Sequence, residues 1–140
     1  MMADPLAAVG VRVAVIGMVG AGTFAGREGL RRWQAGRRRR VLDGGAIPEM
    51  SQGEPTVLLF SGTLCSECIR QKEALSTLTR SGPSFRVSEV MAAKDPALAG
   101  RFGVQSVPAT VVLNGKGKAV AVNYGFAEAE LIASQLAKGA

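Results

Sequence analysis

The chain has 140 residues, enough for one compact domain and a short additional segment. It contains two cysteines and no histidine, which excludes Cys–His and Ser–His catalytic pairs and leaves too few ligands for a mononuclear zinc site, so no metal site is predicted. The net charge of +6 arises in residues 1–40, which hold eight arginines and two carboxylates; residues 41–140 hold nine basic and nine acidic side chains, so no nucleic-acid partner is expected.

An apolar segment stands near the N-terminus. Residues 6–26 contain one charge, Arg12, and as an α-helix they would be about 31 Å long, close to the ~30 Å of a bilayer's hydrocarbon core. Arg12 lies near one end, so its guanidinium can reach the headgroup level. We therefore predict that residues 1–26 are an N-terminal transmembrane anchor, with residues 6–26 in contact with membrane lipid. Gly22 and Gly26 would let a transmembrane partner subunit approach closely.

Three other interpretations of this segment stay open. A cleaved signal peptide would end near residues 23–25, although no net positive charge precedes its apolar part. The glycine-rich stretch between Val13 and Gly22 is also typical of a nucleotide-binding loop, which would need a complete βαβ unit behind it. The third interpretation is a helix buried in the core of a soluble domain.

A basic segment follows the apolar one. Residues 27–40 contain seven arginines and Trp33, whereas Asp4 is the only charged side chain in residues 1–5. Arginines on one side of an apolar span mark the cytoplasmic side, and Trp favours the headgroup level. We therefore predict a single-pass protein of the cell membrane whose C-terminal domain faces the cytoplasm; an exported domain is the alternative. Residues 27–55 are predicted to be a juxtamembrane segment that ends in a Gly/Pro-containing linker from residue 44 onward.

Strand and helix patterns then alternate over residues 56–140 in the order β-α-β-α-β-β-α. Apolar runs and alternation predict the strands, and an Asn-Gly-Lys-Gly sequence between the last two predicts a hairpin. Helical periodicity, with an Asp-Pro start for the second helix, predicts the helices. The predicted strands are residues 56–61, 85–90, 110–113 and 119–124, and the predicted helices are residues 66–80, 96–102 and 128–138. This order predicts an α/β domain.

The two cysteines lie three positions apart, where the first predicted strand leads into the first predicted helix. Cys65 would stand at the start of the helix, where unpaired N–H groups and the helix dipole stabilise a thiolate. Cys68, one step along the same helix face, is near enough to close a disulfide. Cys65 can then attack a substrate disulfide and Cys68 can resolve the mixed disulfide. Half of a metal site, or a pair of buried small apolar side chains, is the alternative.

A second signal lies 40 residues after Cys68. Pro108 stands just before the third predicted strand, and in a fold that brings it beside a reactive dithiol it is a candidate for a cis peptide bond with Val107. The alternative is an ordinary proline at the start of a strand.

Together, the strand at residues 57–60, the Cys65-Ser-Glu-Cys68 motif, the Val107-Pro108 pair and the hairpin resemble the thioredoxin family over residues 56–138. The resemblance implies a thioredoxin-like fold, with a central mixed sheet flanked by helices, preceded here by one transmembrane helix. It also implies a thiol–disulfide oxidoreductase in which Cys65 is the nucleophile and Cys68 resolves. Val107 would pair its backbone with bound substrate beside Pro108. Protein or small-molecule disulfides are the expected partners, and no cofactor beyond the dithiol is expected.

The chain departs from the family's pattern around the dithiol. Leu64 stands where the family has tryptophan, and Ser66 and Glu67 stand between the cysteines in place of Gly-Pro. Leu59 occupies the position of the buried aspartate that assists the second cysteine, and it cannot move a proton. Glu67 places negative charge beside the thiolate. Ser66 and Glu67 are therefore expected to modulate the site, and we predict a reducing or weakly poised pair.

The anchor, the arginine cluster and the domain order are similar to single-span thioredoxin-like proteins of Gram-positive actinobacteria. The first hypothesis is a membrane-tethered thiol–disulfide oxidoreductase with an anchor at residues 1–26, a linker segment at 27–55 and a thioredoxin-like domain at 56–140. The alternative is a non-enzymatic accessory subunit of a membrane complex that docks through the same fold. A third hypothesis is metal handling by the cysteine pair in a dimer.

Overall fold

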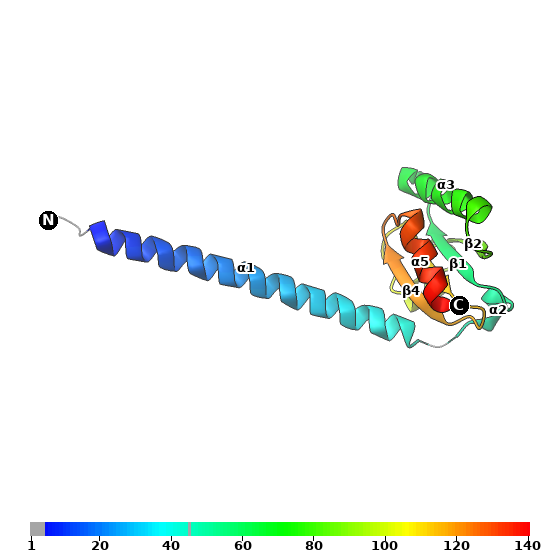
Figure 1. The fold of residues 1–140 in the computed structure, drawn as a ribbon, viewed down its shortest axis with the longest axis horizontal. Coiled ribbons are helices and arrows are strands. Elements are labelled where there is room, and N and C mark those ends of the chain that lie inside the picture. The colour runs from blue at the N-terminus through cyan, green and yellow to red at the C-terminus, as the bar shows by residue number, and fades with distance from the viewer. Residues whose placement is uncertain (1–4, 45) are drawn as a thin grey trace. The chain divides into compact units, whose positions relative to one another are not determined.

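Figure 1 shows the fold of a computed structural model, which describes residues 5–44 and 46–140, with side chains from residue 9 onward. The chain divides into two compact units between Arg37 and Arg38. The first unit is formed by a helix, and the second is an α/β domain.

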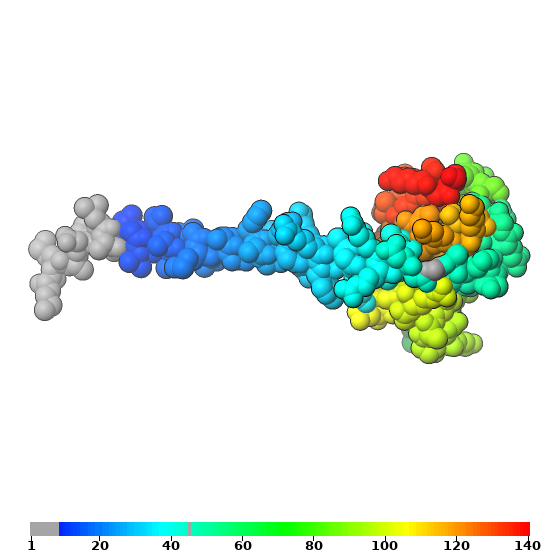
Figure 2. Space-filling model, turned by 90° about the horizontal axis from the view of Figure 1, so that it is seen from below, coloured from blue at the N-terminus to red at the C-terminus, as the bar shows by residue number. Residues whose placement is uncertain are grey.

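The helix α1 (Pro5–Leu42) is continuous for 38 residues. Its apolar window has a mean hydropathy of 1.6, and none of that window is buried among the described residues. In the space-filling view, the blue part of α1 carries its side chains on the outside (Figure 2). The helix is therefore long and apolar enough to cross a membrane. The glycine-rich stretch lies within this helix and not in a loop, which contradicts the interpretation as a nucleotide-binding loop.

The basic stretch continues the same helix. No proline lies between Gly26 and Leu42, and local pairs of side chains support the helix there: Glu28 pairs with Arg32 at 3.5 Å. The guanidinium of Arg37 lies 5.6 Å from the ring centroid of Trp33. The helix ends where Asp43 and Gly44 follow, at the start of the glycine- and proline-containing stretch.

A four-stranded mixed sheet forms the centre of the second unit. Its strand order is β2-β1-β3-β4; β1 pairs with β2 in parallel and with β3 antiparallel, and β3 pairs antiparallel with β4. Every residue of β1 and β3 is buried, as expected for strands covered on both faces. The strands are β1 (Thr56–Ser61), β2 (Arg86–Met91), β3 (Ala109–Leu113) and β4 (Ala119–Tyr124). The predicted α/β class and element order are confirmed, with strand bounds that differ by one residue at most.

Helices cover both faces of the sheet. On one face, α3 (Ser66–Ser81) and α5 (Ala129–Gly139) pack on a cluster that contains Leu59 and Val112 (Figure 1). On the other face, α4 (Pro96–Arg101) packs on a cluster that contains Phe60. Asp95 caps α4 by accepting a hydrogen bond from the Leu98 N–H at 2.9 Å, as its Asp-Pro start predicts.

The sequence interpretation of residues 44–55 as a linker differs from the structure. This stretch contains a short helix, α2 (Pro48–Ser51), and packs against the domain. The Ile47 N–H donates to the Gly117 carbonyl at 2.9 Å, and the buried Ser51 hydroxyl donates to the Gly115 carbonyl at 3.1 Å. A side chain at Gly117, whose φ is +76°, would collide with the Ile47 backbone. Backbone pairing with the β3–β4 hairpin therefore holds a segment whose composition is typical of a linker.

Candidate active site

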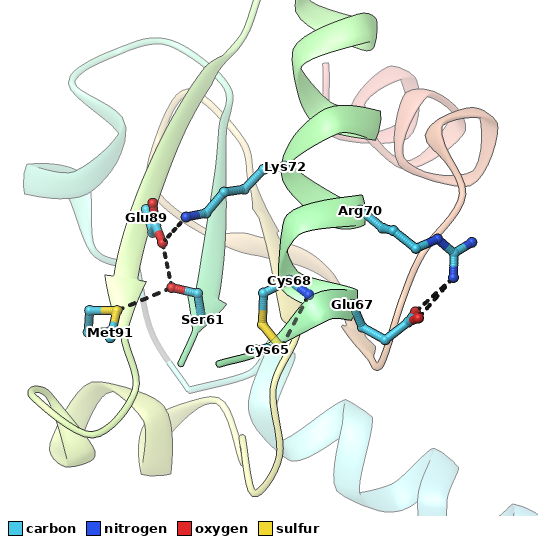
Figure 3. Close-up of a disulfide and its surroundings, with 8 residues drawn as sticks. All are labelled: Ser61, Cys65, Glu67, Cys68, Arg70, Lys72, Glu89 and Met91. Carbon is cyan, nitrogen blue, oxygen red and sulfur yellow. Dashed lines mark hydrogen bonds and ion pairs between the residues drawn. A yellow bond between two sulfur atoms is a disulfide. The ribbon is translucent and has the colours of Figure 1, made fainter. Parts of the chain in front are cut away.

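Cys65 and Cys68 form a disulfide at the N-terminus of α3, with their Cα atoms 5.2 Å apart (Figure 3). Cys65 is the N-cap residue of the helix, and its Sγ accepts a hydrogen bond from the Cys68 N–H at 3.2 Å. Cys65 is partly exposed, whereas Cys68 is only 2% exposed. An attacking cysteine must be reachable and a resolving one need not be, so the more exposed Cys65 is the better candidate for the nucleophile.

The Val107–Pro108 peptide bond is cis, as predicted. Pro108 is buried at the start of β3, and Val107 is half-buried. A Cβ built on Gly62 would lie 3.0 Å from Val107 Cγ2, so Val107 packs closely on the loop that leads to Cys65. The fold thus brings the Val107–Pro108 pair close to the loop that leads to Cys65, although the cysteine motif and the proline lie 40 residues apart in the sequence.

The two residues between the cysteines are both exposed in the first turn of α3. Glu67 does not stand alone, because both of its carboxylate oxygens lie 3.0 Å from Nη1 of Arg70 (Figure 3). The Arg70 guanidinium also lies 4.4 Å from the Phe126 ring centroid. Arg70 therefore offsets part of the negative charge that Glu67 places near the dithiol. Its position three residues after Glu67 is the sequence signal that would have found it. Ser66 is the first residue of the helix.

Apolar side chains surround the exposed side of the dithiol. Leu64 is fully exposed, at 107% relative accessibility, and has a φ of +53°, where a leucine is strained. Ile69 is 59% exposed. A depression of about 470 Å³ runs between them and is lined by Gly62, Leu64, Cys65, Ser66, Cys68, Ile69 and Lys72.

A group of polar side chains that the sequence analysis did not predict lies on the face of the sheet that α3 covers. Lys72 Nζ lies 2.7 Å from Glu89 Oε1, and the buried Ser61 hydroxyl donates to the same oxygen at 2.5 Å (Figure 3). The hydrogen bond from Lys72, and then that from Ser61, lower the pKa of the Glu89 carboxyl. In the parallel pairing of β1 with β2, Glu89 lies beside Leu59, the residue that stands where the thioredoxin family has a buried aspartate. A carboxylate therefore lies next to that position, on the neighbouring strand β2.

No group of three or more His, Cys, Asp or Glu side chains within residues 5–44 and 46–140 is placed to hold a metal ion.

Solved structures similar to this chain include thioredoxins and a thioredoxin-like protein. A mutant thioredoxin from Halobacterium salinarum NRC-1 is 20% identical, with a TM-score of 0.57 over 64% of this chain and 77% of that one. An uncharacterized thioredoxin-like protein from Clostridium perfringens is 26% identical, with a TM-score of 0.54 over 62% and 71%. Oxidised mitochondrial thioredoxin 3 from Saccharomyces cerevisiae is 22% identical, with a TM-score of 0.54 over 64% and 83%.

No protein-family model and no curated protein sequence matches the chain. The similarity therefore rests on structure, and it confirms the predicted thioredoxin-like fold.

Proposed function

We propose that this chain, with its thioredoxin fold, is a membrane-tethered thiol–disulfide oxidoreductase. The observation that carries the proposal is the Cys65–Cys68 pair at the start of α3, together with a cis Val107–Pro108 bond whose valine packs against the loop that leads to Cys65. A dithiol at a helix N-terminus has stabilisation for a thiolate in its backbone. The reaction needs no cofactor beyond the two cysteines.

The proposed reaction moves two electrons from the dithiol to a substrate disulfide. The Cys65 thiolate attacks one substrate sulfur, so a mixed disulfide forms and the other substrate sulfur leaves as a thiolate that takes up a proton. The Cys68 thiol loses its proton to water, and its sulfur attacks Cys65 Sγ. This second step closes the Cys65–Cys68 disulfide and releases the second substrate thiol. A dithiol donor reverses the exchange and restores the reduced protein.

Substrate is proposed to bind across Leu64, Ile69 and Val107. Leu64 and Ile69 expose apolar surface on either side of the dithiol, and exposed apolar side chains beside a reactive group favour an apolar partner. The backbone of Val107, beside the cis bond, would pair with an extended substrate segment. Protein disulfides flanked by apolar residues are therefore the favoured substrates, with small-molecule disulfides as weaker ones.

The redox pair is proposed to be reducing or weakly poised, with Ser66 and Glu67 as modulating residues. Glu67 disfavours the Cys65 thiolate, and Arg70, at 3.0 Å from Glu67, reduces that effect. The opposing charges are both exposed and screened by water, so neither should dominate.

The membrane assignment is part of the proposal. Helix α1 supports a single span, and the arginines on its C-terminal side support a domain that faces the cytoplasm, as in the single-span actinobacterial proteins that the chain resembles. Membrane lipid would contact residues 6–26, and a transmembrane subunit could pack on Gly22 and Gly26. A reporter that matures only in the cytoplasm, fused after Ala140, should be active. Activity of an export-dependent reporter at that position would contradict this orientation.

Catalysis is tested with the full chain in detergent. With a dithiol donor, it should reduce a peptide disulfide flanked by apolar residues over several turnovers. Cys65→Ser should abolish the reaction, whereas Cys68→Ser should still attack once and then stop as a mixed disulfide. A Ser134→Ala variant, altered on the exposed side of α5, controls for handling of the protein. If neither cysteine variant loses activity, or if the parent chain shows no turnover, the proposal is contradicted and the accessory subunit is favoured.

A further inference from the structure

We propose that Lys72 is the cation that stabilises the Cys68 thiolate during resolution, and that Glu89 and Ser61 position its ammonium group. The inference rests on the proposed function and names a positioning network for the second step of that reaction.

The need for such a group follows from the burial of Cys68. Its side chain is 2% exposed, and an apolar environment disfavours a thiolate. Resolution nevertheless requires Cys68 as the nucleophile. Leu59, on the strand that leads to the dithiol, offers no charge or proton. Beyond the backbone N–H groups of the first turn, stabilisation must therefore come from another element or from further along α3.

Lys72 is placed to supply it. It lies four residues after Cys68 and so projects from the same face of α3, one turn further on. It lines the depression that both cysteines line, and it is the one charged side chain among the described residues that line it. Glu67 and Arg70, the other charged groups of the first turns, are paired with each other at 3.0 Å.

Glu89 and Ser61 orient the ammonium group. In the parallel register, Glu89 pairs with Leu59, so its side chain rises on the face of the sheet that α3 covers. Its Oε1 binds Lys72 Nζ at 2.7 Å and accepts the hydrogen bond from Ser61 at 2.5 Å, as Figure 3 shows. These contacts keep the carboxylate ionised, which is the direction of its pKa shift. The Lys72 side chain thus lines the dithiol depression, and its ammonium group is bound to a carboxylate that β1 and β2 hold in place.

The size of the effect follows from distance and solvent. Side chains four residues apart on a helix have Cβ atoms about 5–6 Å apart, and an opposite charge within about 4–6 Å changes a pKa by roughly 1–3 units, which is the upper limit for Lys72. The Lys72 side chain is 48% exposed and is paired with Glu89, so water and that pairing reduce the effect. We expect Lys72→Met to raise the pKa of the Cys68 thiol by about half a unit to one unit.

The test titrates Cys68 directly, by the ultraviolet absorbance of its thiolate, in the full chain in detergent with Cys65→Ser as background. Lys72→Met should raise the thiol pKa, and Lys72→Arg should retain most of the parent value. Lys116→Met removes the same charge from the exposed β3–β4 hairpin, at the end of β3 away from Pro108, and should change nothing. Equal titration of the Lys72→Met and Lys116→Met variants would overturn the inference.

The Glu89→Gln variant tests whether the Lys72 cation or the Glu89 carboxylate acts on the Cys68 thiol. Glutamine keeps an oxygen for Lys72 and Ser61 but removes the negative charge, so the thiol pKa should stay the same or fall. A rise would show that the ion pair with Glu89 is needed to hold Lys72 near the thiolate, in keeping with the positioning role of Glu89, whereas parent pKa values in both Glu89→Gln and Lys72→Met would overturn the inference. The titration uses no disulfide substrate. If the titration is unchanged while the parent chain with both cysteines is catalytically active, this inference alone is refuted; if the titration shifts while that parent chain is inactive, the proposed function alone is refuted.

Discussion

Replacing Gln71 by leucine should strongly destabilise the α/β domain. Gln71 lies on α3, is fully buried, and uses both ends of its amide on one residue. Its Nε2 donates to the Ala127 carbonyl at 3.0 Å, and its Oε1 accepts from the Ala127 N–H at 2.7 Å. Ala127 is itself buried, in the loop between β4 and α5. The Gln71 side chain thus supplies hydrogen bonds to both backbone groups of Ala127, a residue that lies in a loop and not in a strand or helix.

The magnitude follows from the two groups that would lose their partners. A buried donor or acceptor left without a hydrogen bond costs about 1–3 kcal/mol. Leucine itself is easier to bury than the amide, which offsets part of that loss. We expect Gln71→Leu to lower the free energy of unfolding by about 2–4 kcal/mol, a large part of the roughly 5–15 kcal/mol that holds a domain of this size folded.

The assay is urea unfolding of residues 38–140, followed by far-ultraviolet circular dichroism because the sole tryptophan, Trp33, lies outside that unit. Glu73→Leu introduces the same side chain on the exposed face of the same helix, and it should change stability by less than about 0.5 kcal/mol. If Gln71→Leu behaves like Glu73→Leu, other partners must satisfy Ala127, and the reasoning is refuted.

Three further predictions concern strain, charge and the domain boundary. Leu64→Gly should stabilise the protein by about 1 kcal/mol, because it relieves a positive φ without loss of buried surface, and it should slow exchange with apolar-flanked peptides. The folded-state pKa of Glu89 is lowered, so the ionised carboxylate stabilises the fold above the unfolded-state pKa, and this stabilisation is lost as the pH falls through the folded-state pKa. When the urea midpoint is plotted against pH, Glu89→Gln should therefore lose less stability at acidic pH than the parent does. Residues 38–140 should be soluble and folded, whereas residues 56–140, which lack the buried Ser51 contact, should unfold at lower urea or aggregate.

The sequence contains most of the information on the sheet and the dithiol. Apolar runs, alternation and turn residues locate every strand to within one residue: β1 and β3 are buried and lie between Pro, Gly or Asn residues, β4 ends just before Gly125, and β2, which has no buried residue, is found by its alternation. The Cys65–Cys68 spacing and the proline at 108 are local signals of a site, and the structure packs Val107, next to that proline, against the loop that leads to Cys65.

Contacts between distant segments could not be read from the sequence in the same way. Glu89 reaches Lys72 only because β2 pairs with β1 in a register that sets Glu89 beside Leu59. Gln71 resembles any polar residue on a helix until the loop at Ala127 is known to lie against it. Residues 44–55 have the composition of a linker, and their backbone pairing with the hairpin leaves no trace in that composition.

The most direct test of the central claim is to trap the intermediate on Cys65 in cells. The full chain with Cys68→Ser should accumulate disulfide-linked adducts that a reductant releases, and mass spectrometry should place the linkage on Cys65. The chain with Cys65→Ser and Cys68→Ser serves as the control and should form none. If the Cys68→Ser chain forms no adducts above this control, while it is folded and reaches the membrane, Cys65 is not an attacking thiol and the account is contradicted.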